Sequence, residues 1–437
     1  MKFWLHTYGC QMNVRDSEAV EAMLLAAGHV KAASEQAADL VIVNSCTVRQ
    51  KAENKALGKI GYLLSQSHRA VGLMGCVVSR LGEAAIKKQF PKLDFCVRPG
   101  HLLEIPYVAQ TLDPLGAHPI FNPPLSTSTS TSTSFSAFVT VMTGCDNCCS
   151  YCIVPKTRGH EYSRPAEDIV REVECLAQQG VKEVTLLGQS VLKWNEKLRM
   201  ENGELTAVSF PQLLRRLNEI EGLERIRFTS AHPKGCTEEL IAAYRDCKKV
   251  CRHLHLPVQS GSDRLLKEMG RRYTREEYLS AVKKLREFDS EFSLTTDVIV
   301  GYPGETAADF EATRSLMDEA GFDNAFVFKY SPRPGTRSAA LEDDVPTEEK
   351  ERRDQVLLAD QEARGLKRNQ SLVGTVREVL VEGPSKRNKA RWSGRDSGNR
   401  IVVWDVSAEN PSTLKPGTLV RVKILEAHPQ ILVGEIF

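Results

Sequence analysis

Four cysteines lie within eight residues of the chain, at positions 145, 148, 149 and 152 in the segment CDNCCSYC. Two ligand registers fit this run. Cys145-x2-Cys148 beside Cys149-x2-Cys152 gives the paired spacing of zinc knuckles, but no second ligand pair at a characteristic separation is evident. Cys145-x3-Cys149-x2-Cys152 gives three thiolates and leaves Cys148 over. Three thiolates suit a 4Fe-4S cluster, whose fourth iron then stays open for an outside ligand.

Three further cysteines, Cys10, Cys46 and Cys76, each come just after a segment typical of a β-strand. The strand-like segments are KFWLHTY, ADLVIVNS and AVGLMG, and helical patterns separate them. This βαβαβ order predicts an open parallel sheet. Because the loops after the carboxyl ends of parallel strands converge on one crevice, these three cysteines are expected to meet.

The rest of the chain must position these two sets. Six strand-like segments between residues 137 and 330 alternate with amphipathic helices, which predicts a partial (β/α)6 barrel with its working face at the carboxyl ends of the strands. Short valine-rich segments then predict a small β-barrel. The predicted α/β chain therefore has an open parallel N-terminal domain, a partial barrel and a small C-terminal β-barrel. The expected boundaries are 1–105, a low-complexity linker at 106–136 containing STSTSTSTS, 137–368 and 369–437.

Composition narrows the class of protein. The chain has 437 residues, 41% hydrophobic and 26% charged, without an apolar run of the roughly 20 residues that span a membrane. The N-terminus lacks a signal-peptide pattern, so we expect a cytoplasmic protein without a membrane partner. In that reducing compartment, 12 cysteines indicate metal ligands or catalytic thiols rather than disulfides. Because the formal net charge is only +2, any polyanionic partner is expected to bind to local basic patches.

The motifs also carry a family resemblance. Cys145-x3-Cys149-x2-Cys152, with Tyr151 before the last cysteine, resembles the cluster motif of radical S-adenosylmethionine (SAM) enzymes. The segments TYGCQMN, NSCTVR and MGCVVSR resemble the N-terminal domain of methylthiotransferases, whose three cysteines hold an auxiliary 4Fe-4S cluster. The C-terminal segments resemble a TRAM domain, an RNA-binding module. The resemblance thus implies two 4Fe-4S clusters and SAM as cofactors.

The resemblance implies methylthiolation of C2 of N6-isopentenyladenosine beside the anticodon of tRNA. One SAM would give the 5′-deoxyadenosyl radical and a second SAM the methyl group. A radical suits this carbon, because its C–H bond is not acidic. The implied partners are tRNA, a reductant such as flavodoxin or ferredoxin, and a sulfur donor, and we expect a monomer. The rival substrates are threonylcarbamoyladenosine in tRNA and a ribosomal-protein aspartate, and a non-catalytic iron-sulfur or zinc RNA-binding protein is a third interpretation.

Other polar and glycine residues end barrel strands, where they are candidates for contacts to SAM or substrate, although each also suits an ordinary βα turn. These candidates are Gly188, Gln189, Gln259, Ser260, Asp297 and Gly301. Arg158 and Arg164 follow the cluster loop and are candidates for binding phosphates or the SAM carboxylate. His253 and His255 are expected to be structural, since no third ligand is evident. Basic residues crowd around Trp392 in the C-terminal segment and predict RNA binding: Lys386, Arg387, Lys389, Arg391, Arg395 and Arg400.

Overall fold

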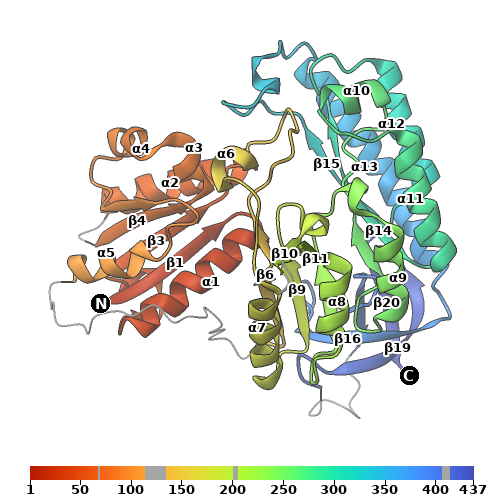
Figure 1. Ribbon diagram of the computed structural model, residues 1–437, viewed down its shortest axis with the longest axis horizontal. Helices are drawn as coiled ribbons and strands as arrows, with labels where there is room; N and C mark the ends of the chain where they lie inside the picture. Colours follow the sequence, from red (N-terminus) through yellow and green to blue (C-terminus); the bar gives the residue numbers. More distant parts are fainter. Residues whose placement is uncertain (67–68, 114–133, 200–204, 406–413) are drawn as a thin grey trace.

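The computed structural model describes residues 1–66, 69–113, 134–199, 205–405 and 414–437, which form three domains (Figure 1). The order of strands and helices confirms the predicted α/β architecture with a small C-terminal β-barrel. Within the described residues, no helix is long and apolar enough to cross a membrane.

The N-terminal domain is a five-stranded parallel sheet in the order β2-β1-β3-β4-β5, so short edge strands flank the three predicted strands. Its strands are β1 (Lys2–Tyr8), β2 (Val30–Lys31), β3 (Leu40–Ser45), β4 (Ala70–Gly75) and β5 (Phe95–Val97). Its helices are α1 (Gln11–Ala26), α2 (Gln50–Gln66), α3 (Cys76–Leu81), α4 (Glu83–Gln89) and α5 (Glu104–Leu112), with a 3-10 turn at Glu35–Ala37.

Helices cover both faces of this sheet. All residues of β3 are buried, as expected for a central parallel strand that packs on both faces. Helices α1 and α5 pack on one face through residues such as Leu24 and Ile105, and α2 packs on the other through Ile60. The boundary predicted at residue 105 therefore lies inside α5, and a structureless linker is wrong for 106–112. Most of the remaining predicted linker, 114–133, lies outside the described residues.

The central domain contains six parallel strands in two sheets of three, β12-β9-β6 and β13-β14-β15. A parallel bridge between Ile226 and Val250 links the two sheets into one curved wall, the predicted partial barrel. The strands are β6 (Ser136–Thr140), β9 (Glu183–Leu187), β12 (Arg225–Phe228), β13 (His253–His255), β14 (Ser293–Val300) and β15 (Asn324–Lys329), with accessory strands β7 (Met142–Thr143), β8 (Tyr162–Ser163), β10 (Asn195–Arg199) and β11 (Leu205–Ser209).

Amphipathic helices cover the outside of this barrel and bury one continuous hydrophobic core. They are α7 (Ala166–Gln178), α8 (Phe210–Asn218), α9 (Glu238–Asp246), α10 (Asp263–Glu268), α11 (Arg275–Phe288), α12 (Ala307–Ala320) and α13 (Thr347–Gln370), with 3-10 turns at Val191–Lys193, Pro233–Gly235 and Ser338–Ala340. The short helix α6 (Val154–Arg158) instead contacts α3 of the N-terminal domain. Several begin with a Ser or Thr cap, as Thr274 does for α11 and Thr306 for α12, so the sequence itself sets where these helices start.

The C-terminal domain is a closed five-stranded barrel in the order β16-β17-β18-β20-β19, around a core that includes Trp404. Its strands are β16 (Val376–Pro384), β17 (Arg391–Asp396), β18 (Ile401–Asp405), β19 (Leu419–Ala427) and β20 (Ile431–Ile436). Closure removes the exposed strand edges that would otherwise pair with other chains.

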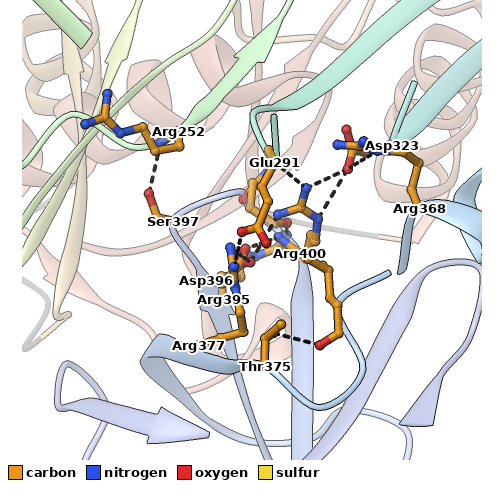
Figure 2. A network of polar contacts seen from close by, with 12 residues as sticks. Arg252, Glu291, Asp323, Arg368, Thr375, Arg377, Arg395, Asp396, Ser397 and Arg400 are labelled. Carbon is orange, nitrogen blue, oxygen red and sulfur yellow. Dashed lines mark hydrogen bonds and ion pairs between the residues drawn. The ribbon is translucent and has the colours of Figure 1, made fainter. Parts of the chain in front are cut away.

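A buried network of charges fixes this barrel to the central domain (Figure 2). Arg400 donates to Asp323 at 2.7 Å and to the carbonyl of Glu291 at 3.0 Å, and it pairs with Asp396 at 3.3 Å. On the same junction, Arg252 donates its backbone N–H to Ser397 at 2.9 Å. Arg400 is only 8% exposed, and its donors are used by protein acceptors. The prediction that Arg400 binds RNA is therefore wrong.

Candidate active site with two cysteine triads

One cavity of about 290 Å³ brings together all six predicted ligand cysteines. We call Cys145, Cys149 and Cys152 the loop triad, because one loop of the central domain carries them. Cys10, Cys46 and Cys76 are the strand triad, because each lies just beyond the carboxyl end of a strand of the N-terminal sheet. The cavity thus lies between two domains.

Backbone geometry fixes the loop triad. Gly144 has φ +75°, and a Cβ there would collide with the backbone of His160, so glycine is required where the loop begins. Ser150 donates its N–H to the carbonyl of Met269 at 2.9 Å and ties the middle of the loop to the barrel. Cys148 is exposed and does not line the cavity. This placement separates Cys148 from the triad and favours the three-thiolate register over paired zinc knuckles.

A buried arginine contacts the loop triad. Arg271 donates to the Sγ of Cys149 at 3.5 Å, to the carbonyl of Pro257 at 3.0 Å and to the hydroxyl of Tyr273 at 3.0 Å. Its side chain is therefore held in one orientation beside the sulfur, with little access to water. A fixed positive charge at this position stabilises negative charge on the cysteine sulfur.

The strand triad uses the start of α1 and the loop after β3. Cys10 is the N-cap of α1, so it lies at the point where this helix begins. A hydrogen bond from Cys46 lowers the pKa of Cys10 to about 6, and the same bond together with burial raises the pKa of Cys46. The backbone N–H of Val48 also donates to the Cys46 sulfur at 3.3 Å. Cys10 is thus held close to its thiolate form, the form that binds metals.

A second arginine connects the two triads. Arg158 ends α6, six residues after the loop triad, and its guanidinium donates to Asp16 of α1 at 2.6 Å. Burial raises the pKa of Cys76, and the charge of Arg158 together with a hydrogen bond opposes this effect. Arg158 therefore lies against the strand triad and also lines the cavity, and its expected contact with a phosphate or the SAM carboxylate stays a prediction.

Arg164 has a structural position. It pairs with Glu172 at 2.7 Å, and Arg15 of the N-terminal domain donates to the other oxygen of Glu172 at 2.8 Å. Glu172 is 5% exposed, so this arrangement is a buried arginine–glutamate–arginine group that spans the domain boundary. It does not line the cavity.

The donor sets fit iron-sulfur clusters better than a single metal ion. Among the described residues, no group of three or more His, Cys, Asp or Glu side chains is arranged around one ion position. In a cluster each thiolate binds a different iron, so the sulfurs lie farther apart than around one zinc ion. Two sets of three cysteines, each with a positive charge or backbone donor beside a sulfur, have the chemistry that such clusters require.

Four of the predicted cofactor residues line the cavity: Gly188, Gln189, Gln259 and Asp297. The Oε1 of Gln189 is buried without a hydrogen-bond partner in the described structure, so it is an acceptor available to a bound molecule. Gln259 adopts φ +70°, a strained conformation for a residue with a side chain, while its backbone N–H bonds to Asp297 at 2.8 Å. These features fit a polar ligand such as SAM.

Two predicted cofactor residues do not line the cavity. Ser260 is fully buried, and its hydroxyl bonds to that of Thr313 at 3.2 Å, so it joins the barrel to α12. Gly301 donates its N–H to Glu305 at 2.5 Å, and a Cβ at Gly301 would collide with Lys350. The structure therefore gives both residues a packing role, the glycine in the close approach of the β14–α12 turn to α13, and their expected contacts with SAM or substrate stay predictions.

The cavity-lining residues that sequence reasoning missed include Arg271, His232 and Ser230. Burial and the nearby charge of Arg271 lower the pKa of His232 to about 3, so this histidine is neutral at pH 7. Ser230 has φ +63°. His232 and Ser230 both follow β12, so the rule that functional residues follow strand ends would have found them. His253 and His255 both contact the hydroxyl of Thr295 at 3.0 Å, and of the two only His255 lines the cavity.

Comparison with known proteins assigns a family to each domain. Residues 139–317 match the radical SAM superfamily, residues 2–98 match the uncharacterized protein family UPF0004, and residues 370–437 match the TRAM domain. Together with the cysteine-lined cavity, these matches define an enzyme of the radical SAM class, which implies a 4Fe-4S cluster and SAM.

Whole-chain relatives define the class further. A tRNA-2-methylthio-N(6)-dimethylallyladenosine synthase from Akkermansia muciniphila is 40% identical over 95% of this chain and 95% of its own length. The enzyme of that name from Syntrophomonas wolfei is 42% identical over 100% of this chain and 98% of its own length. This chain belongs to the family of tRNA-2-methylthio-N(6)-dimethylallyladenosine synthases.

Among solved structures, the fold is similar to that of the radical SAM methyltransferase TsrM from Kitasatospora setae with cobalamin and a [4Fe-4S] cluster bound. The TM-score is 0.53 at 16% identity, and the match covers 77% of each chain. This likeness concerns the fold alone, and it supports the arrangement of an α/β domain beside a radical SAM barrel.

Proposed function

We propose that this enzyme adds a methylthio group to C2 of N6-isopentenyladenosine beside the anticodon of tRNA. The observation that carries the proposal is the shared cavity, in which both cysteine triads face one space at the carboxyl ends of two parallel sheets. Two cysteine sets in one cavity suit a reaction in which hydrogen removal and sulfur insertion occur at the same carbon.

In this proposal the loop triad holds the cluster that binds SAM, and the strand triad holds an auxiliary 4Fe-4S cluster. When bound, these clusters and two SAM molecules supply radical hydrogen abstraction, sulfur and a methyl group. The side chains of the cavity would orient the reactants. Arg271 donates to the Cys149 sulfur, the Oε1 of Gln189 can accept a hydrogen bond from SAM, and His232 lines the cavity as a neutral imidazole. The enclosure by two domains limits access of water to the site.

The remaining partners follow from this chemistry. A reductant such as flavodoxin or ferredoxin would reduce the loop-triad cluster, and a sulfur donor would resupply the strand-triad cluster. We propose that the enzyme works on tRNA as a monomer in the cytoplasm.

The direct test of the proposed substrate is nucleoside mass spectrometry of tRNA from a strain lacking this gene, before and after complementation. We expect the methylthio mark on isopentenylated adenosine to disappear and then return. A mark restored instead on threonylcarbamoyladenosine, or on a ribosomal-protein aspartate, would contradict the proposal. Release of no 5′-deoxyadenosine from the reduced enzyme with SAM would support a non-catalytic RNA-binding protein.

For tRNA binding we propose the exposed loop between β16 and β17 as the main contact in the C-terminal barrel. Lys386, Arg387 and Lys389 are exposed there. The other two candidates, Arg391 and Arg395, already form ion pairs within the barrel. Arg391 donates to Asp405 and Arg395 donates to Glu382, each at 2.8 Å. The three free cations are therefore better placed to contact phosphates.

Replacing Lys386, Arg387 and Lys389 with alanine tests this loop. Because each phosphate contact releases counterions, the salt slope of tRNA binding should fall by about 2. The matched control replaces the exposed Lys87, Lys88 and Lys92 of the N-terminal domain, which removes equal charge elsewhere. Equal slopes in the loop variant and the wild type would rule the loop out.

A further inference from the structure

Two phenylalanine side chains are exposed on the inner face of the last barrel strand. Phe326 is 49% exposed and Phe328 is 38% exposed, both on β15. The alternate residues of this strand face outward: Ala325 and Val327 pack on the hydrophobic core, and Lys329 pairs with Glu351 of α13 at 2.9 Å. The outer face of β15 is therefore covered, while its inner face presents aromatic surface.

This surface is continuous with the cavity. Phe326 pairs in register with Asp297 of β14, and Phe328 pairs with Ile299. Since directly paired residues share one face of a sheet, all four side chains lie on the inner side of the barrel. The ring of Phe326 meets that of His255 edge-on at 6.0 Å, and both His255 and Asp297 line the cavity. We call Phe326, Phe328 and Ile299 the apolar shelf.

The shelf runs from the cavity wall toward the carboxyl end of β15, where the six-stranded barrel remains open. Neighbouring apolar side chains left exposed beside a polar cavity are typical of a ligand contact rather than of packing. The charges nearby restrict the ligand. Asp297 places a carboxylate at the inner end of the shelf. Lys329, the nearest cation along β15, forms an ion pair with Glu351 on the opposite face of the strand.

We propose that the apolar shelf binds the dimethylallyl group on N6 of the substrate adenosine and selects for it. This inference rests on the proposed function. The dimethylallyl group is a branched, uncharged hydrocarbon that would bury apolar surface against two phenylalanine rings. A threonylcarbamoyl group and an aspartate side chain both carry a carboxylate, which Asp297 repels and which no shelf residue pairs with. The shelf thus distinguishes the proposed substrate from both rivals.

The test uses the anaerobically reconstituted full-length enzyme and two anticodon stem-loop RNAs that differ only in the N6-dimethylallyl group. Fluorescence anisotropy should show that the wild type binds the dimethylallyl RNA more tightly than the unmodified RNA. Replacing both Phe326 and Phe328 with alanine should reduce this preference at least about tenfold, with little change in affinity for the unmodified RNA. The control, Leu358→Ala, removes a side chain that is 42% exposed on α13 and should keep the preference.

A conservative pair of substitutions, Phe326→Leu with Phe328→Leu, keeps apolar surface and should retain most of the preference. An alanine variant that prefers dimethylallyl RNA as strongly as the wild type would overturn the inference, and so would a leucine variant that loses as much as the alanine variant. A third stem-loop RNA, with a threonylcarbamoyl group on the same nitrogen, tests the proposed function separately: a wild type that prefers and modifies this RNA would overturn that function.

Discussion

The two cysteine triads reach the same cavity by different routes. The loop triad lies within eight consecutive residues, and the barrel holds its loop through Gly144 and Ser150. The strand triad is assembled from three strand ends spread over residues 10 to 76 and depends on the parallel order of the N-terminal sheet. One arginine serves each set: Arg271 contacts Cys149, and Arg158 lies beside Cys76. A local sequence motif and a set of strand ends can thus build related sites, and the strand triad also receives a positive charge, that of Arg158, from the neighbouring domain.

The largest expected effect comes from removing each triad in turn. Replacing the loop triad with alanine should abolish both 5′-deoxyadenosine release and methylthiolated product, because the proposal assigns the cluster that cleaves SAM to this triad. Replacing the strand triad should abolish the methylthiolated product while SAM cleavage continues. Both products are measured by liquid chromatography and mass spectrometry after anaerobic reduction.

Cys148→Ala is the matched control for both triads, since this cysteine is exposed outside the cavity. It should keep both products. A strand-triad variant that still makes the methylthiolated nucleoside would contradict the division of roles between the two sets.

The next effect concerns the domain boundary beside the strand triad. The side chains of Arg158 and Asp16 are 6% and 13% exposed, so Asp16→Asn leaves a largely buried arginine without its counter-charge. We expect a loss of about 3 to 5 kcal/mol in unfolding free energy, measured by denaturant titration. Iron bound by the strand triad should become labile to chelators, while SAM cleavage is retained.

Arg171→Met provides the control for the boundary, because it removes one partner of an exposed ion pair with Asp168 in the same domain. It should change the unfolding free energy by less than about 1 kcal/mol. If Asp16→Asn had as small an effect, the Arg158–Asp16 pair would not be what stabilises the strand triad.

The smallest effect should be a shift in reduction potential. Arg271→Met removes a positive charge and a hydrogen bond from Cys149, so the loop-triad cluster should be harder to reduce by about 60 mV, which corresponds to a tenfold change for one electron. Redox titration followed by electron paramagnetic resonance measures this shift. The strand-triad cluster is the internal reference, and an equal shift in both clusters would show that the effect of Arg271 is not local.

Much of the fold was predictable because its signals are local. Strand and helix periodicity gave the three-domain order, and the capping threonines at the starts of α11 and α12 agree with the sequence pattern. The spacing of the cysteine run leaves two registers open, and the lack of a second zinc-ligand pair together with the resemblance to the radical SAM motif favours the loop triad. The strand triad follows from the rule that loops after parallel strands converge, which the N-terminal sheet obeys.

Contacts between domains were not predictable in the same way. Arg400 lies in a basic stretch of sequence, yet Asp323 and Glu291 from a distant segment bury it. Arg158 follows the cluster loop, yet its partner Asp16 belongs to the N-terminal domain. The sequence shows where an arginine lies in the chain, but it does not show which acceptor from another domain will pair with it. The apolar shelf was not predicted either, because the exposure of one face of β15 depends on the barrel being open beside that strand.

The most direct test of the central claim is the iron and sulfide content of the anaerobically reconstituted full-length chain, read with its Mössbauer spectrum. Two four-iron clusters in one cavity predict about eight irons per chain, and about four in each triad variant. A wild type that binds about four irons, or that binds zinc instead, would contradict the account.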